Sequence, residues 1–430
     1  MTTDKAARIT TGPVFPGAGT AEALSAEALG DGFRILIYSH DSFGLGHLRR
    51  CRAIAHALVE HRSNLSVLIL SGSPIIGSFD FRSRVDFVRV PGVIKLRNGE
   101  YTALNLHIGL QQTLAIRESI IRHTAEVFAP HLFLVDKEPL GLRGEIEETL
   151  AFLKERRTPL VLGLRDVIDE PELLQPEWER KNAVPALSKY YDSIWVYGLP
   201  QICDPLEGLG LSETVQRKAV YTGYLPRSVP DAPLSPEAER AADEPFVLVT
   251  AGGGGDGDEL IDWVLRAYEQ TGPMPWRAVL VFGPFMPSER QAEFRQRAAA
   301  LLQVSTLVFD AHLEALMERA SGVVAMGGYN TFCEILSLDK PAVIVPRTRP
   351  RLEQRIRAER AQEFGLVRML DPDYLADTRA MAGAIRGLAL QNRPSEVVVP
   401  GLMDGVESIA RLTDRALERP AVEPLRLVQP

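Results

Sequence analysis

The stretch VVAMGGYNTFCEILSLDKPAVIVPRTRPRLEQRIRAER, residues 323–360, decides what fold to expect for the whole chain. An apolar run from Gly322 to Met326 ends at the pair Gly327 and Gly328, and apolar residues then recur at the spacing of a short buried helix. Strand, glycine turn and helix therefore follow one another. A helix that begins on a glycine turn points unpaired backbone N–H groups above the sheet, and its dipole favours anions there.

A second strand and helix follow this unit directly. Residues 341–346 predict the strand, and Glu353 and Gln354 open the helix behind it. An isolated glycine pair is more often a plain structural turn, but two consecutive strand ends meet at one crevice, where open parallel sheets bind ligands. Glu334 lies one turn into the first helix, close enough to reach a sugar hydroxyl but poorly suited to phosphate.

Length and composition favour two large domains in a reducing cytoplasm. The chain has 430 residues and a net charge of −8, so no global field attracts nucleic acid and we expect no such partner. Three widely spaced cysteines, Cys51, Cys203 and Cys333, exclude a disulfide framework and a cysteine zinc site. Residues 1–30 lack the apolar core of a signal peptide and predict a disordered tail. No apolar run approaches the roughly 18 residues of a membrane-spanning helix.

The first predicted strand leads into a turn that carries a histidine. Residues 33–39 are a short apolar run, and Gly44 and Gly46 make the turn that follows it. His47 then lies in the first turn of the next helix, at the carboxyl edge of the strand. A capping or core histidine is the plain alternative, but a position on a glycine turn that faces the crevice favours a functional role.

Alternating strands and helices predict a doubly wound α/β domain over residues 31–227. Two of its strand ends carry polar clusters that border the crevice, where both ligand contacts and structural ion pairs collect. The further predicted strands are 65–70, 87–90, 132–135, 160–164 and 193–196. The clustered residues are Asp136, Lys137 and Glu138 after the third of these strands, and Arg165 and Asp166 after the fourth.

A second parallel sheet is expected over residues 245–403, after a linker at 228–244 that is rich in proline, alanine and charge. Its first strand, 246–250, ends in AGGGGDG, which predicts a second phosphate cradle because glycines let the backbone approach a ligand closely. This loop is neither a P-loop nor a GxGxxG fingerprint. The remaining strands are predicted at 278–282, 306–309, 322–326 and 341–346, and residues 404–430 are predicted to form a last helix and a tail.

These features together resemble the two-domain glycosyltransferase fold GT-B, in which two Rossmann-like parallel-sheet domains face each other across a cleft. The chain looks like the family of the lipid II-forming N-acetylglucosaminyltransferase over roughly residues 33–415. The clusters KEPLGLRGE and GLRDVID are similar to those of an uncharacterised subgroup of predicted glycosyltransferases. FGLGHLRRCRAIAHAL also resembles the UDP-sugar hydrolase of pseudaminic acid synthesis, in which the matching histidine activates water.

The resemblance implies roles for individual residues. Glu334 would hold the donor ribose, Gly328 to Thr331 the diphosphate, and Glu353 and Gln354 the sugar hydroxyls; the family's enzyme has two glutamines at this last pair, which leaves the sugar open. The implied donor set is Gly252, Gly253, Gly254, Gly255, Asp256, Phe309, His312, Gly327, Gly328, Tyr329, Asn330, Thr331, Glu334, Glu353 and Gln354. The acceptor side would comprise Gly44, Gly46, Asp136, Lys137, Glu138, Arg165 and Asp166.

The leading functional hypothesis is a cytoplasmic hexosyltransferase that moves a sugar from a UDP-linked donor to an unknown acceptor hydroxyl. His47 would be the general base, and the reaction would invert the anomeric centre without a metal or cofactor, since no DxD-type motif stands out. Hydrolysis, 2-epimerisation supported by Asp136, Glu138 and Asp166, and sugar-nucleotide binding without catalysis remain alternatives.

The arginines of residues 347–360 raise the question of a membrane contact. They offer contacts to phosphate or to an anionic membrane surface, but the stretch lacks the aromatic residues of an interfacial helix. A solvated helix face is therefore the favoured interpretation, and peripheral membrane contact remains open.

Overall fold

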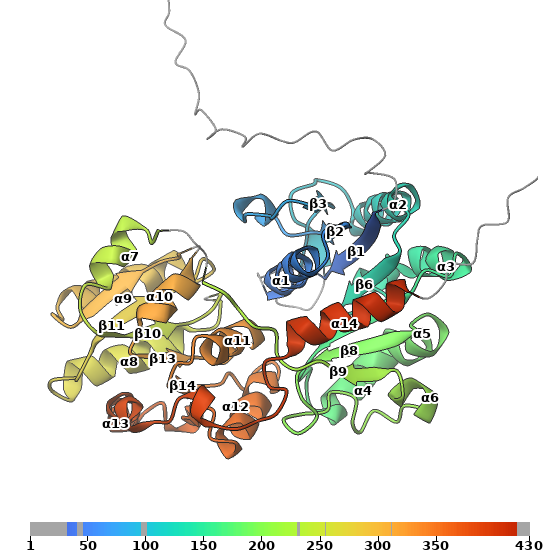
Figure 1. Cartoon of the computed structure of the whole chain (residues 1–430). Coiled ribbons are helices and arrows are strands. Elements are labelled where there is room, and N and C mark those ends of the chain that lie inside the picture. Colours follow the sequence, from blue (N-terminus) through green and yellow to red (C-terminus); the bar gives the residue numbers. More distant parts are fainter. Residues whose placement is uncertain are drawn as a thin grey trace, which may run out of the picture. The chain divides into compact units, whose positions relative to one another are not determined.

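Two parallel sheets carry the fold of this computed structural model (Figure 1). The structure describes residues 32–40, 46–95, 101–229, 233–253, 255–310 and 312–418. The predicted tail at 1–30 and the predicted site residues Gly44 and Gly254 lie outside these ranges, as does the end of the chain after residue 418.

The first sheet has seven parallel strands in the order β3-β2-β1-β6-β7-β8-β9. Strand β1 lies between β2 and β6, with Ile35 opposite both Val67 and Leu132. The strands are β1 (Phe33–Ser39), β2 (Leu65–Ser71), β3 (Val85–Arg89), β6 (Leu132–Asp136), β7 (Leu160–Arg165), β8 (Ser193–Tyr197) and β9 (Ala219–Tyr221). The helices are α1 (Gly46–His61), α2 (Leu110–Phe128), α3 (Glu147–Glu155), α4 (Pro171–Arg180), α5 (Ala183–Lys189) and α6 (Glu213–Gln216), and β4 (Val93–Lys95) pairs with β5 (Tyr101–Ala103) in a separate ribbon.

The second sheet has six parallel strands in the order β12-β11-β10-β13-β14-β15. The strands are β10 (Phe246–Thr250), β11 (Arg277–Val281), β12 (Val304–Leu307), β13 (Gly322–Ala325), β14 (Ala342–Ile344) and β15 (Arg368–Met369). The helices are α8 (Asp258–Gln270), α9 (Ser288–Ala299), α10 (Leu313–Arg319), α11 (Tyr329–Ser337), α12 (Glu353–Glu363) and α13 (Thr378–Gly387). Within the predicted linker, Pro236–Ala241 form the short helix α7.

The last helix, α14 (Gly405–Leu417), returns to the first half of the chain and packs against α1 (Figure 1). Asp414 accepts hydrogen bonds from Arg62 at 2.7 Å and contacts His61 at 2.8 Å. At the start of the helix the backbones touch, because the Gly405 N–H donates to the carbonyl of Tyr224 at 3.1 Å. A Cβ on Gly405 would lie 2.4 Å from that carbonyl oxygen, so only glycine fits this approach.

The prediction of an α/β fold with two Rossmann-like parallel sheets is confirmed. The central strands are buried on both faces, as continuous apolar runs in parallel sheets require. The strand predicted at 306–309 is wrong by two residues, because β12 ends at Leu307 and the exposed Phe309 has already left the sheet. The short edge strands β9 and β15 were not predicted, since two or three residues carry too little pattern.

Candidate active site

His47 is held by a carboxylate from the neighbouring strand. Helix α1 begins at Gly46, so His47 lies in its first turn, while Asp136 is the last residue of β6. The Nδ1 atom of His47 lies 2.5 Å from Oδ2 of Asp136. Arg50, one turn further along α1, donates to the same carboxylate from Nε at 2.9 Å and from Nη2 at 2.7 Å. Because β6 lies beside β1, the crossover brings together residues that are 89 positions apart.

This arrangement sets the protonation state of the histidine. Burial would raise the pKa of Asp136, but Arg50 and His47 hold it well below its usual value, so the carboxylate is charged. A carboxylate only accepts hydrogen bonds, which places the imidazole proton on Nδ1 and the lone pair on Nε2. Burial lowers the pKa of His47, and although Asp136 opposes this shift, the ring is neutral near pH 7. A neutral, oriented imidazole is suited to accept a proton.

The glycine turn after β13 creates a helix N-terminus over the sheet. Gly327 has φ +77°, and a Cβ there would lie 2.6 Å from Cγ2 of Ile344. The first hydrogen bond in α11 runs from the Phe332 N–H to the carbonyl of Gly328 at 2.9 Å. The N–H groups of Tyr329, Asn330 and Thr331 precede it and are the helix's free donors. The turn thus has the geometry of an anion site.

The glycine loop after β10 lies on the same cavity. Gly252 has φ +63°, and the chain at Gly283 passes so close that a Cβ on Gly283 would lie 2.5 Å from the Gly252 carbonyl oxygen. The N–H of Phe285 donates to the carbonyl of Gly253 at 2.9 Å, which braces the loop. At the end of the loop, Asp256 pairs with Arg347.

One cavity of about 270 Å³ brings these parts together. Its wall includes His47 from the first half of the chain and both glycine turns from the second. Of the predicted residues, those on the wall are Gly46, His47, Arg165, Gly252, Gly253, Asp256, Phe309, Gly327, Gly328, Tyr329, Asn330, Thr331 and Gln354. The other predicted residues within the described ranges do not line this wall; they are Asp136, Lys137, Glu138, Asp166, Gly255, His312, Glu334 and Glu353.

Glu334 is buried beneath an arginine from the first half of the chain. Nη2 of Arg49 donates to its Oε1 at 2.6 Å and also bonds Glu314. Burial, supported by Glu314, raises the pKa of Glu334 to about 7, while Arg49 opposes the shift. Its second oxygen, Oε2, is buried without a hydrogen-bond partner among the described residues. The sequence predicts Glu334 within reach of a donor sugar hydroxyl, and in this structure Arg49 covers its carboxylate.

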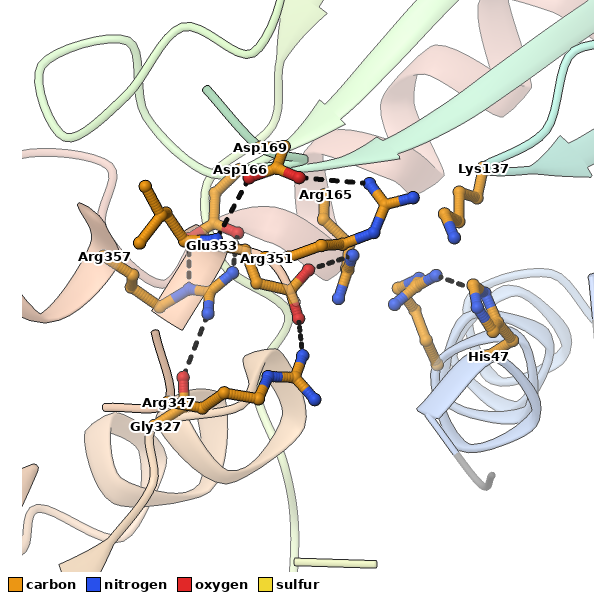
Figure 2. Close-up of polar contacts among 12 residues, drawn as sticks. His47, Lys137, Arg165, Asp166, Asp169, Gly327, Arg347, Arg351, Glu353 and Arg357 are labelled. Carbon is orange, nitrogen blue, oxygen red and sulfur yellow. Dashed lines mark hydrogen bonds and ion pairs between the residues drawn. The ribbon is translucent and has the colours of Figure 1, made fainter. Parts of the chain in front are cut away.

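Glu353 and Gln354 begin α12 and are both held in place. Glu353 bonds Arg165 and Arg347 at once, and although burial opposes it, these arginines together with Arg357 lower the pKa of Glu353 to about 2 (Figure 2). Oε1 of Gln354 accepts from the backbone N–H of Arg347 at 2.9 Å. Glu353 is therefore an ionised, pre-oriented carboxylate next to the cavity.

The arginine-rich stretch is a solvated face only in part, because some of its arginines are held in ion pairs inside the protein. Arg357 is buried, and it donates from Nε and Nη2 to the two oxygens of Asp166 at 2.7 and 2.6 Å (Figure 2). Its Nη1 donates to the carbonyl of Gly327 at 2.9 Å, so it also supports the glycine turn. Arg351 pairs with Glu177 at 2.7 Å. Arg349 and Arg360 are exposed, and Arg355 is partly exposed.

Three arginines matter here although the sequence interpretation did not assign them to the site: Arg49, Arg50 and Arg347 lie on the cavity wall. A pair of adjacent arginines three residues after a glycine turn was a possible signal, because successive residues at the start of a helix reach different partners. The carboxylates that Arg49 and Arg50 bond, however, lie 86 to 285 positions away in the chain.

Two further properties concern ligands and membranes. Among the described residues, no group of three or more His, Cys, Asp or Glu side chains is arranged to hold a metal ion. Within the same ranges, no helix is long and apolar enough to cross a membrane.

Comparison with known proteins gives a family match for the second half. Residues 247–390 match the glycosyltransferase family 28 C-terminal domain. No curated protein matches the chain by sequence. The family match and the shared fold of solved glycosyltransferases support a glycosyltransferase.

Solved structures share the fold at low sequence identity. CalG4, the calicheamicin glycosyltransferase, is 18% identical with a TM-score of 0.57 over 92% of this chain and 100% of its own. MurG of Acinetobacter baumannii is 13% identical with a TM-score of 0.54 over 89% and 99%. A UGT transferase from Siraitia grosvenorii in complex with UDP is 14% identical with a TM-score of 0.59 over 90% and 100%. These likenesses show the GT-B fold.

Proposed function

We propose that the protein transfers a sugar from a UDP-sugar to an acceptor hydroxyl, with inversion at the anomeric carbon and without a metal. The observation that carries the proposal is that His47, oriented by Asp136 behind it, lies on the wall of the same cavity as two glycine turns. The family 28 match covers the half that contains both turns, and one structural neighbour was solved in complex with UDP.

The second half would bind the donor. The free N–H groups at the start of α11 would hold the diphosphate, and Gly252 and Gly253 would let the backbone approach it. The guanidinium of Arg347 on the cavity wall adds a fixed positive charge. Preorganised donors of this kind stabilise the charge that develops on a leaving diphosphate. Glu334 would accept hydrogen bonds from the donor ribose hydroxyls through its unpartnered Oε2, which requires that Arg49 moves off the buried carboxylate when the donor binds.

His47 would move the proton. The acceptor oxygen attacks the anomeric carbon while Nε2 of His47 takes the hydroxyl proton, and the bond from that carbon to the diphosphate oxygen breaks. The released electron pair stays on the diphosphate at the start of α11. A single displacement of this kind inverts the anomeric centre, and Asp136 stabilises the imidazolium that forms.

The carboxylates on which 2-epimerisation depended are all engaged elsewhere. Asp136 bonds Arg50 and His47, and Glu138 accepts from Lys181 at 2.8 Å. Asp166 is fully buried in its contacts with Arg357 and with Tyr224. None of them lies on the cavity wall as a free acid or base, so transfer is the better supported reaction. Hydrolysis uses the same base with water in place of the acceptor.

We assign acceptor binding to residues 31–227 and donor binding to residues 245–403, with α14 attached to the first half. The test begins with a thermal-shift screen of UDP-, GDP- and dTDP-sugars, which we expect to select UDP. Each binding sugar nucleotide is then incubated with and without a panel of hydroxyl acceptors, and products are identified by mass spectrometry. Acceptor-dependent UDP release supports transfer. Rapid release of UDP and free sugar without acceptor would instead establish a hydrolase, and a changed sugar an epimerase.

A further inference from the structure

Lys137 is a partly buried cation that neither the fold nor the proposed chemistry explains. It directly follows Asp136 and adopts the left-handed conformation, with φ +69°, which costs a non-glycine residue on the order of 1 kcal/mol. The backbone is fixed there because its N–H donates to the carbonyl of Gly163 at 2.8 Å. Strain of this kind at the end of a strand beside a catalytic pair is typical of a functional position.

The ammonium group of Lys137 makes no hydrogen bond to any described residue. Its nearest carboxylate oxygen, Oε1 of Glu138, lies 3.6 Å away, and Glu138 is already bonded by Lys181. The side chain is 19% exposed. Figure 2 shows it extending toward the space between His47 and the guanidinium of Arg351, and no dashed line reaches it. The ammonium group is thus partly withdrawn from water and has only this longer ion pair, which leaves its N–H donors free for a ligand.

Two arginines next to Lys137 also keep unused donors. Within the described ranges, Nε of Arg165 is buried without a hydrogen-bond partner, although its Nη2 bonds Glu353. Nη1 of Arg351 has no hydrogen-bond partner among the same residues, and the nearest Asp169 oxygen, Oδ2, lies 3.6 Å away. Burial and the neighbouring charges of Arg165, Arg351 and Lys181 lower the pKa of Lys137 against the opposing effect of Glu138. Three cations therefore have spare N–H donors beside His47.

A second cavity lies close to this cluster, on the side of His47 that belongs to the first half of the chain. It has a volume of about 850 Å³ in the first half of the chain, and its wall includes Glu138, Lys181 and His40. The ring of His40 lies 5.7 Å from the ring of His47, centroid to centroid. Arg165 lies on the wall of the first cavity with His47, and Glu138, which lies next to the Lys137 ammonium, is on the wall of the second. A molecule on the first-half side of His47, where we place the acceptor, would therefore come next to the cluster.

We propose that Lys137, Arg165 and Arg351 bind an anionic group, a carboxylate or a phosphate, of the acceptor. The inference rests on the proposed function and names the class of acceptor: a hydroxylated molecule whose negative charge lies next to the reacting hydroxyl. Charge-assisted hydrogen bonds from an ammonium and two guanidinium groups are among the stronger polar contacts, and they position as well as bind. The site would thus select charged acceptors over neutral ones of the same shape.

The experiment is calorimetric titration of the protein, saturated with UDP, with glucose 6-phosphate, glucuronic acid and glucose. We expect one of the two anions to bind at least tenfold more tightly than glucose, and which of them does so tells phosphate from carboxylate. Lys137→Met should abolish the difference. Lys189→Met is the matched control, because the Lys189 side chain on α5 is 66% exposed. This variant should keep the difference in affinity between the anions and glucose. Arg351→Gln provides a second test should Lys137→Met fail to fold.

Four results would overturn the proposal. The first is equal affinity for glucose and both anions, and the second is wild-type anion affinity in folded Lys137→Met. If anions bind only without UDP, the cluster belongs to the donor diphosphate. If Lys137→Met weakens UDP-glucuronic acid but not UDP-glucose, and leaves the free anions unaffected, the negative charge belongs to the donor sugar. Failure of UDP itself to bind rejects the proposed function instead, and the anion titrations without UDP still report on the cluster.

Discussion

The substitution Asp136→Asn tests the mechanism most directly, because it leaves the base in place and removes the carboxylate that orients it. The same carboxylate also bonds the buried Arg50, so the free energy of unfolding of the variant is measured alongside its turnover. The contact between the carboxylate and Nδ1 of His47 is 2.5 Å long and partly buried. A hydrogen bond to a charged group is worth about 1.5–3 kcal/mol, which corresponds to a roughly 10- to 150-fold fall in kcat. His47→Asn removes the base itself and should cost about 10²- to 10⁴-fold. The double substitution should lose no more than His47→Asn alone, because the two residues act as one unit.

The pH dependence of kcat/KM provides an independent test of the role of Asp136. His47 must be neutral to act, and its folded-state pKa is lowered from 6.5, so the acidic limb of kcat/KM should lie below pH 6.5. Asp136 raises the pKa of His47 while Arg50 lowers it. In Asp136→Asn the carboxylate is lost and Arg50 remains, so the limb should move to lower pH even as the rate falls.

The assay is steady-state turnover with the donor and acceptor found by the screen, measured from pH 4.5 to 9. Asp414→Asn is the matched control, since it removes the carboxylate from another His–Asp contact, with His61, far from the cavity in the fold. It should leave kcat and the pH profile unchanged. Wild-type kcat in Asp136→Asn, or an acidic limb that moves to higher pH, would refute the orienting role of Asp136.

Three further substitutions test the donor side and the fold. Glu334→Gln should weaken UDP binding by about 1–3 kcal/mol in calorimetry, the worth of hydrogen bonds to a charged group; unchanged affinity would remove Glu334 from the ribose site. Gly327→Ala places a Cβ 2.6 Å from Ile344 at φ +77° and should weaken UDP binding at least tenfold. Gly328→Ala, whose Cβ meets no atom within 4 Å, should weaken UDP binding less. Equal effects of the two substitutions would contradict the role of the turn geometry. Asp166→Asn leaves the buried Arg357 without its carboxylate and should lower the free energy of unfolding by about 3–5 kcal/mol in urea; a loss below about 1 kcal/mol would show that the pair is dispensable.

The expected donor site shows how far local sequence reaches. Gly327 and Gly328 interrupt an apolar run, and a run followed by glycines and a helical spacing predicts β13, the turn and α11 from fewer than twenty residues. The same logic located the loop after β10. These features depend on backbone preferences and on the period of apolar residues, which act over a few residues and are therefore visible in the chain itself.

For the charged side chains, the sequence predicted where the clusters lie but not which partners they bond. The clusters after β6 and β7 were located by sequence, but whether they make ligand contacts or ion pairs remained open there. The structure shows that Asp136 and Asp166 are held by arginines, whereas Lys137 is not hydrogen-bonded by any described residue. An ion pair needs two partners, and a sequence shows only one of them at a time.

The sequence by itself determined the two parallel sheets, the two glycine turns and the position of His47 at the start of a helix. Only the tertiary structure decided that Asp136 orients His47, that Arg49 covers Glu334 and that Arg357 is buried with Asp166. The physical reason is the strand order: β1 pairs with β6, and the ends of distant strands and helices meet at one cavity. Local preferences fix each element, but contacts between side chains 89 to 285 residues apart depend on how the elements pack.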